Sequence, residues 1–131
     1  MRLGAGQGPG IVVLERGARP GLLRAIGEVD ASNVDYFSSV LFSESRRVTL
    51  LTLDVTRLRF LGGEGMRAIL RIARQLHERG GALHLVGPNR LVKRMFSVLR
   101  AERAPGITLL DDEVTLTTDV GAEALTPDPT S

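Results

Sequence analysis

Short apolar runs alternate with amphipathic segments along most of this chain, and that alternation limits the possible folds more than any other feature. Residues 48–55 (VTLLTLDV) and 82–86 (ALHLV) are nearly all apolar, which is typical of strands covered on both faces. Between them, residues 64–79 place an apolar side chain every three or four positions, which predicts a helix with one buried face. Strands that alternate with such helices predict an α/β fold with a mostly parallel sheet.

Further elements extend this pattern in both directions. Residues 11–15 and 21–30 predict an antiparallel N-terminal hairpin, because Arg19-Pro20-Gly21 can turn the chain between them. An amphipathic helix is expected to end at Arg46-Arg47, with Ser32 or Asn33 as its side-chain N-cap. A further helix, capped by Asn89, precedes a last strand at residues 107–110. The apolar residues expected to face inward from it are Leu91, Val92, Met95, Phe96 and Leu99.

The 131 residues suit one domain. We expect a flexible lead-in at residues 1–10, a single α/β domain at 11–118, and an acidic, disordered tail at 119–131. Residues 11–15 are expected to form an edge strand that could pair between copies of the chain, so monomer and dimer both stay open.

Composition excludes several classes of function. The chain has no Cys and two His, which leaves no thiolate chemistry and too few ligands for a metal centre, and no cofactor is expected. No apolar run approaches the ~18 residues of a membrane helix, and no signal stretch is present, so a soluble cytoplasmic domain is expected.

The charge of this chain is divided between two regions. The formal net charge is only +2, with +6 at residues 64–103 and −6 at residues 104–131. This is a dipole rather than a basic surface, so direct binding of nucleic acid is not expected.

Few residues are candidates for chemistry. Glu28 and Asp30 share a strand face, but no third ligand lies obviously near, and Asp54 is expected to bond the turn after its strand. The glycine-rich loop 61–65 precedes the long helix and lacks the residues of a P-loop, while Glu64 would repel an anion. With no nucleophile–base pair in sight, the residues predict a non-catalytic domain.

Three segments in order resemble the STAS domain family, the anti-sigma factor antagonists or anti-anti-sigma factors of bacterial transcription regulation. They are Gly27-Glu28-Val29-Asp30-Ala31, the stretch Leu53 to Leu61 (LDVTRLRFL), and Gly80 to Pro88 (GGALHLVGP). The resemblance implies a STAS-like fold over residues 11–110. It also implies partner binding through Asp30, Ser32, Asn33, Gly62, Gly63, Glu64 and Gly65.

The chain departs from the family at one loop. The resemblance implies Asp-Ser-Ser/Thr-Gly before the long helix, with the first Ser phosphorylated by a kinase that is also the anti-sigma factor. Gly62 stands at the Asp position, Gly63 at the phosphorylated Ser and Glu64 at the next hydroxyl, and only Gly65 is kept. Phosphorylation adds about −2 charge, and a glycine cannot accept it.

Two hypotheses follow from the resemblance. The first is a protein-binding module that is not switched by phosphorylation at this loop, whose partner is an anti-sigma factor kinase-like protein or another STAS-containing regulator. The alternative is a sensory or scaffold STAS domain that binds a nucleotide or small anion at the N-terminus of the long helix.

Overall fold

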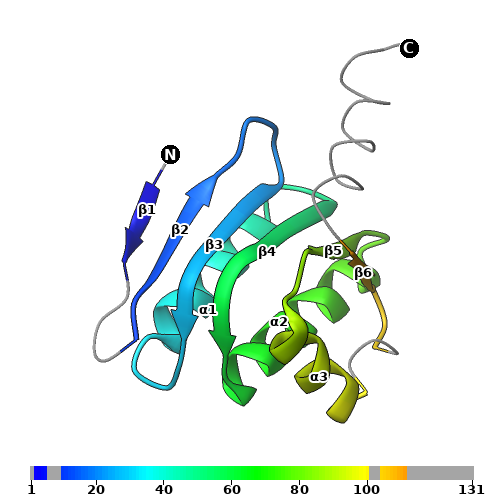
Figure 1. The fold of residues 1–131 in the computed structure, drawn as a ribbon. Helices are drawn as coiled ribbons and strands as arrows, with labels where there is room; N and C mark the ends of the chain where they lie inside the picture. The colour runs from blue at the N-terminus through cyan, green and yellow to red at the C-terminus, as the bar shows by residue number, and fades with distance from the viewer. Residues whose placement is uncertain (1, 6–9, 101–103, 112–131) are drawn as a thin grey trace.

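A single six-stranded sheet forms the centre of the computed structural model, which describes residues 2–5, 10–100 and 104–111 (Figure 1). The strands cross the sheet in chain order, with antiparallel pairing from β1 to β3 and parallel pairing from β3 to β6. Their bounds are β1 Arg2–Ala5, β2 Val12–Arg16, β3 Leu22–Val29, β4 Leu50–Leu61, β5 Ala82–Val86 and β6 Ile107–Leu110. This confirms the predicted mixed sheet with an antiparallel N-terminal hairpin.

Three helices supply the other half of the core: α1 (Val34–Ser45), α2 (Gly63–Glu78) and α3 (Arg90–Val98). Helices α1 and α2 lie behind the sheet in Figure 1. Alternate strand residues face them, so that Leu83 and Leu85 belong to the main core cluster while Val86 packs with Leu22 in a separate small cluster. Helix α2 buries the apolar face that its spacing predicts and exposes its arginines. No helix in the described ranges is long and apolar enough to cross a membrane.

The N-terminal edge of the sheet differs from the sequence-based expectation. Residues 2–5 form β1, although the sequence predicts a lead-in without secondary structure there, and Ala5 pairs with Val13 of β2. Glycine-rich sequence has low strand propensity, but the ladder needs only backbone groups. Strand β2 is therefore paired on both sides, and the expected free edge at residues 11–15 is wrong. Residues 1 and 6–9 of the lead-in and the 119–131 tail lie outside the described residues.

Strand β4 runs to Leu61, well beyond the strand predicted at residues 48–55. Its pairing with β5 ends at Asp54, whereas its pairing with β3 continues to Val29 opposite Leu61. The second half has one neighbour and several exposed side chains, so its sequence is no longer uniformly apolar. This extension carries the chain to the loop before α2.

Helix α3 is capped as predicted but faces the core differently. The Asn89 side chain accepts a hydrogen bond from the Val92 N–H at 2.8 Å. Within this nine-residue helix the buried side chains are Val92 and Phe96, one turn apart. Leu91 and Leu99, which the sequence predicts to face inward, are 46% and 42% exposed. A helix this short rests on the core through one narrow stripe, and the rest of its apolar surface faces outward.

Candidate functional site

The loop before α2 is attached to the end of β3. Gly62 occupies the N-cap position of α2 with an extended backbone, and its N–H donates to the Val29 carbonyl at 2.9 Å. The Gly62 carbonyl accepts the first helical bond, from Met66 N–H at 3.0 Å. Since Val29 directly precedes Asp30, this bond brings loop 62–65 beside loop 30–33.

Loop 30–33 is organised by its own side chains. The Asp30 carboxylate accepts hydrogen bonds from the Ser32 hydroxyl and, at 2.9 Å, from the Ser32 N–H. The Asn33 side-chain oxygen accepts a hydrogen bond from the Asp30 N–H, and the side-chain NH2 group donates to the backbone carbonyls of Glu28 and Gly10. Asn33 holds the N-cap position of α1, but its side chain makes no cap bond, which corrects the expected side-chain cap. Its side-chain amide is instead bonded to three backbone groups, at Gly10, Glu28 and Asp30.

The two loops expose some predicted site residues and bury others. Ser32 and Glu64 are exposed and Asp30 is half-buried, so these three can meet a partner. Asn33 is only 2% exposed. Its contribution to any binding surface would be to hold the loop in place. We call the exposed parts of residues 30–33 and 62–65, together with the first turn of α2, the loop surface.

The hydrogen bond from the Ser32 hydroxyl is the main reason that the pKa of Asp30 lies below its ordinary value. A carboxyl whose pKa is lower in the folded state stabilises the fold above its unfolded pKa, and this stabilisation is lost as the pH falls through the folded pKa. Ser32→Ala should therefore move the pKa of Asp30 up toward 3.8, the ordinary value. An NMR titration of the Asp30 carboxyl checks this, with Ser43→Ala on the exposed side of α1 as a control that leaves the pKa unchanged.

The three glycines of the loop stand in different surroundings. A Cβ at Gly65 would lie 2.7 Å from Leu61 Cδ1 and 2.9 Å from Val29 Cγ1, so this glycine is required by close packing. At Gly62 and Gly63 the nearest atoms would be 3.5 Å and 3.4 Å away, which is ordinary contact, and neither has a positive φ. The loop therefore has room for a side chain at residue 63 and needs glycine only at residue 65.

Charged side chains border the loop surface along α1 and α2. A groove between the two helices is lined by Val34, Asp35, Ser38, Ser39, Glu64, Arg67 and Arg71. At Gly63 the atom nearest to an added Cβ is a guanidinium nitrogen of Arg67. The sequence-based prediction missed this groove. The spacing of Glu64, Arg67 and Arg71 places them on one helix face, but the opposite wall depends on how α1 packs.

The carboxylates singled out in the sequence do not converge. Glu28 pairs with Arg59 at 3.4 Å, while Asp30 is engaged by Ser32. Asp54 lies within β4 and not after it, is 3% exposed, and pairs with Arg24 at 3.5 Å. Asp54 also accepts hydrogen bonds from the Thr56 N–H and hydroxyl. Because Thr56 belongs to β4 as well, the expected bond to a turn after the strand is wrong. In the described ranges no group of three or more His, Asp or Glu side chains could hold a metal ion.

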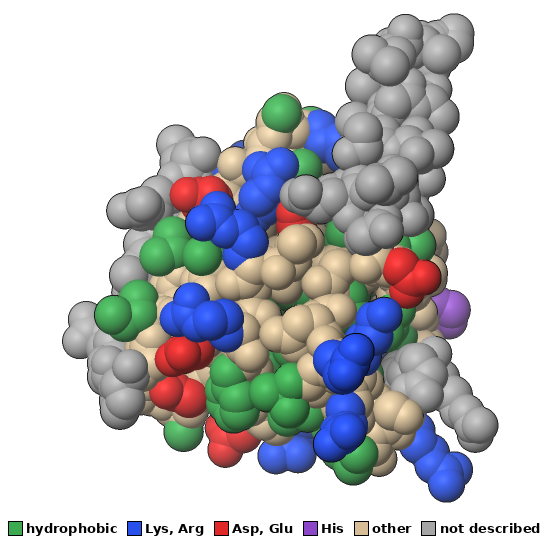
Figure 2. Space-filling model, viewed as in Figure 1, with side chains coloured by type: hydrophobic (Ala, Val, Ile, Leu, Met, Phe, Trp, Pro, Cys, Tyr) green, Lys and Arg blue, Asp and Glu red, His purple; other side chains and the backbone are tan. Residues whose placement is uncertain are grey.

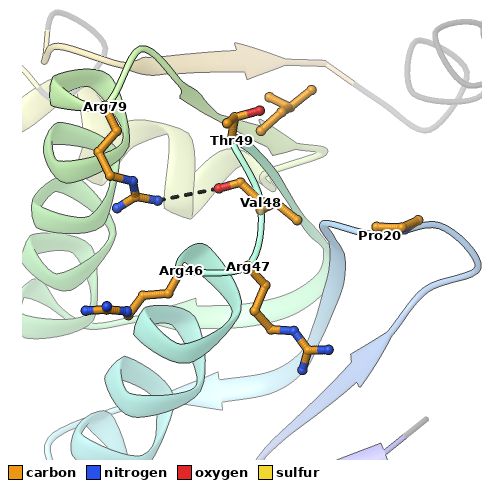
Figure 3. A pocket seen from close by; sticks show the side chains of 7 residues that line it. Pro20, Arg46, Arg47, Val48, Thr49 and Arg79 are labelled. Atoms are coloured by element: carbon orange, nitrogen blue, oxygen red, sulfur yellow. Dashed lines mark hydrogen bonds between the residues drawn. The ribbon is translucent and has the colours of Figure 1, made fainter.

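A second depression lies near the C-terminal ends of α1 and α2. It is lined by Pro20, Val48, Thr49, Leu50 and three arginines, Arg46, Arg47 and Arg79. Figure 3 shows the Arg79 guanidinium turned toward the Val48 carbonyl, while Arg46 and Arg47 extend away from each other. Arg79 also donates to the Ser45 carbonyl at 2.7 Å, and Arg46 lies over the Phe42 ring. These cations stabilise helix C-termini and do not converge on a common point.

The strand order, the parallel second half of the sheet and the helices that connect its strands define the class. They describe the fold found in anti-sigma factor antagonists. The chain belongs to the STAS domain family, whose model matches residues 12–114. This confirms the family that the sequence resembles. No curated protein sequence matches the chain significantly.

Solved structures share the fold at low sequence identity. A Thermotoga maritima protein described as an anti-sigma factor antagonist has a TM-score of 0.66 at 18% identity, covering 82% of this chain and 92% of its own. Unphosphorylated SpoIIAA from Bacillus, an anti-sigma factor antagonist, has a TM-score of 0.63 at 20% identity, covering 84% and 96%. A chain from the complex of the diguanylate cyclase SiaD with its activator SiaC, from Pseudomonas aeruginosa, has a TM-score of 0.57 at 16% identity, covering 84% and 98%.

Proposed function

We propose that this chain is a non-catalytic regulatory module that binds a protein partner through the loop surface and is not switched by phosphorylation there. The observation that carries the proposal is Gly63. It stands where the family places its phosphorylated Ser, yet the backbone and the surrounding space would still accept a side chain. The loop has thus kept the packing glycine Gly65 and the space for a side chain at residue 63, and it lacks the acceptor group.

Membership of the STAS family supports a regulatory protein as the partner. Two structures of the same fold are described as anti-sigma factor antagonists, and another comes from a complex of an enzyme with its activator. The partner proposed is an anti-sigma factor kinase-like protein or another STAS-containing regulator, in bacterial transcription regulation in the cytoplasm. Glu64 then gives the start of α2 a fixed single negative charge where a phosphorylated relative alternates between two charge states.

Charge reversal at Glu64 tests the binding surface. The tagged chain is first used to co-purify its partner from the host lysate, and the dissociation constant of the purified pair is then measured. Glu64→Arg should weaken binding at least tenfold, because it reverses an exposed charge at the centre of the loop surface. Glu78→Arg is the matched control, since Glu78 is exposed at the far end of the same helix and should leave binding unchanged. Equal effects of the two reversals would contradict the proposal.

One observation favours the alternative of a bound nucleotide or small anion. A guanidinium nitrogen of Arg67 lies 3.4 Å from the Cβ position at Gly63, beside the helix N-terminus. Glu64 opposes an anion at the same place. A thermal shift by nucleotides in the unaltered chain that becomes larger in Glu64→Ala would favour the alternative, whereas no shift in either protein favours the protein-binding role.

A further inference from the structure

Helix α3 carries an apolar stripe that nothing in the described structure covers. Leu91, Val98 and Leu99 are 46%, 74% and 42% exposed, and Met95 between them is half-buried. At about 100° per residue these four side chains fall within one arc of the helix, next to the Val92 and Phe96 that enter the core. We call these four residues the α3 stripe.

Three basic side chains and Ser97 make up the rest of the exposed surface of α3. Arg90, Lys93 and Arg94 are all exposed, and Figure 2 shows Lys and Arg side chains gathered over this helix. By the same helical geometry, Arg90 and Arg94 lie between Lys93 and the α3 stripe. The outward side of the helix therefore presents cations along one border of an apolar strip.

The C-terminal segment, residues 112–131, has the complementary composition. It holds five acidic residues and no basic one, with apolar side chains at Val114, Leu116, Val120 and Leu125. The family match ends at residue 114, so most of this segment is additional to the shared domain.

The described chain ends beside α3. Asp111, the residue after β6, lies with its carboxylate 3.6 Å from the Lys93 ammonium group. Half the circumference of a helix, with side chains included, is about 16 Å. Five extended residues, at about 3.3 Å each, span this distance. Asp112 and Glu113 can therefore reach the cations, and Val114 and Leu116 the stripe, without any rearrangement of the domain.

We infer that the acidic C-terminal segment docks in cis on the outward face of α3, with its carboxylates on Arg90 and Arg94 and its apolar side chains on the α3 stripe. The occupant is the chain's own residues 112–131. Covalent attachment gives these residues an effective concentration in the millimolar range, so even weak contacts suffice. This docking involves neither the loop surface nor the proposed partner.

A nitroxide label near the end of the segment tests the inference in the full chain. Because the protein has no Cys, Thr126→Cys gives a single labelling site. The label should broaden the backbone amide signals of Arg90–Leu99 more than those of α1 or β2. In 0.5 M salt the broadening should weaken, because the charge interactions are screened within a few ångströms.

Paired variants separate docking from chance proximity. Val98→Ser combined with Leu99→Ser changes exposed side chains and should abolish the selective broadening. Ile11→Ser, at a residue 56% exposed just before β2, should leave it intact. Uniform broadening, broadening centred on Arg46, Arg47 and Arg79, or the same effect when labelled and observed chains are different molecules would each overturn the inference.

Discussion

Replacing Gly27 with Ala should lower the free energy of unfolding by about 2–5 kcal/mol. Gly27 has a φ of +114°, which L residues rarely adopt. Its added Cβ would lie 2.1 Å from the Ile11 carbonyl oxygen, which already accepts the Glu28 N–H at 2.9 Å. The obstructing atom belongs to the backbone at the start of β2, so the clash can be relieved only by opening the β2–β3 pair.

Gly80→Ala is the matched control for this prediction. Gly80 also has a positive φ, +84°, but an added Cβ would meet nothing within 4 Å. Its cost should be the backbone strain alone, about 1 kcal/mol. Urea unfolding of both variants measures the difference. Equal losses would show that the contact with Ile11 contributes nothing and that the described start of β2 is wrong.

The second large expected effect distinguishes two glycines in the same loop. Gly65→Ala should reduce stability by roughly 1–2 kcal/mol, because overpacking against Leu61 and Val29 outweighs the better helix propensity of alanine. Both neighbours are fully buried and cannot move aside. Gly63→Ala should leave stability unchanged or raise it by up to ~1 kcal/mol, since its Cβ would touch only the mobile end of Arg67.

The sign of the change in unfolding free energy in Gly63→Ala shows whether glycine at residue 63 is a structural requirement or can be replaced. Thermal or urea unfolding of the two variants under one buffer gives both values. If Gly63→Ala destabilises the protein as much as Gly65→Ala, then glycine at residue 63 is a structural requirement. A serine at residue 63 would then not fit the loop without a loss of stability.

Much of the fold follows from hydrophobic periodicity. The buried strands β4 and β5 and the amphipathic helix α2 stand out because each buries a continuous face. Strand β1 and the second half of β4 could not be predicted in the same way. Each is held by backbone pairing with one neighbouring strand, and the side chains show little of the apolar periodicity. The prediction that Leu91 and Leu99 of α3 face inward is wrong, because periodicity identifies an apolar helix face but not the surface against which that face packs.

The candidate site was predictable only in part. Resemblance to the family points to residues 30–33 and 62–65, and the structure brings these loops together through Gly62 and Val29. The hydrogen bonds that the Asn33 side chain donates depend on the Glu28 and Gly10 carbonyls, which lie close to Asn33 only in the folded chain. The difference between Gly63 and Gly65 likewise depends on distances to Arg67, Leu61 and Val29 that no local pattern contains.

The central claim is that the loop before α2 has lost its phosphate acceptor at residue 63, although the loop still has room for a side chain there. The most direct test incubates the unaltered chain and Gly63→Ser with ATP and an anti-sigma factor kinase from the same organism, and locates phosphate by mass spectrometry. The account predicts no phosphate on the unaltered chain and one phosphate, on residue 63, in Gly63→Ser. Phosphate on the unaltered chain, including on the exposed Thr56, or a Gly63→Ser chain that stays unmodified, would contradict it.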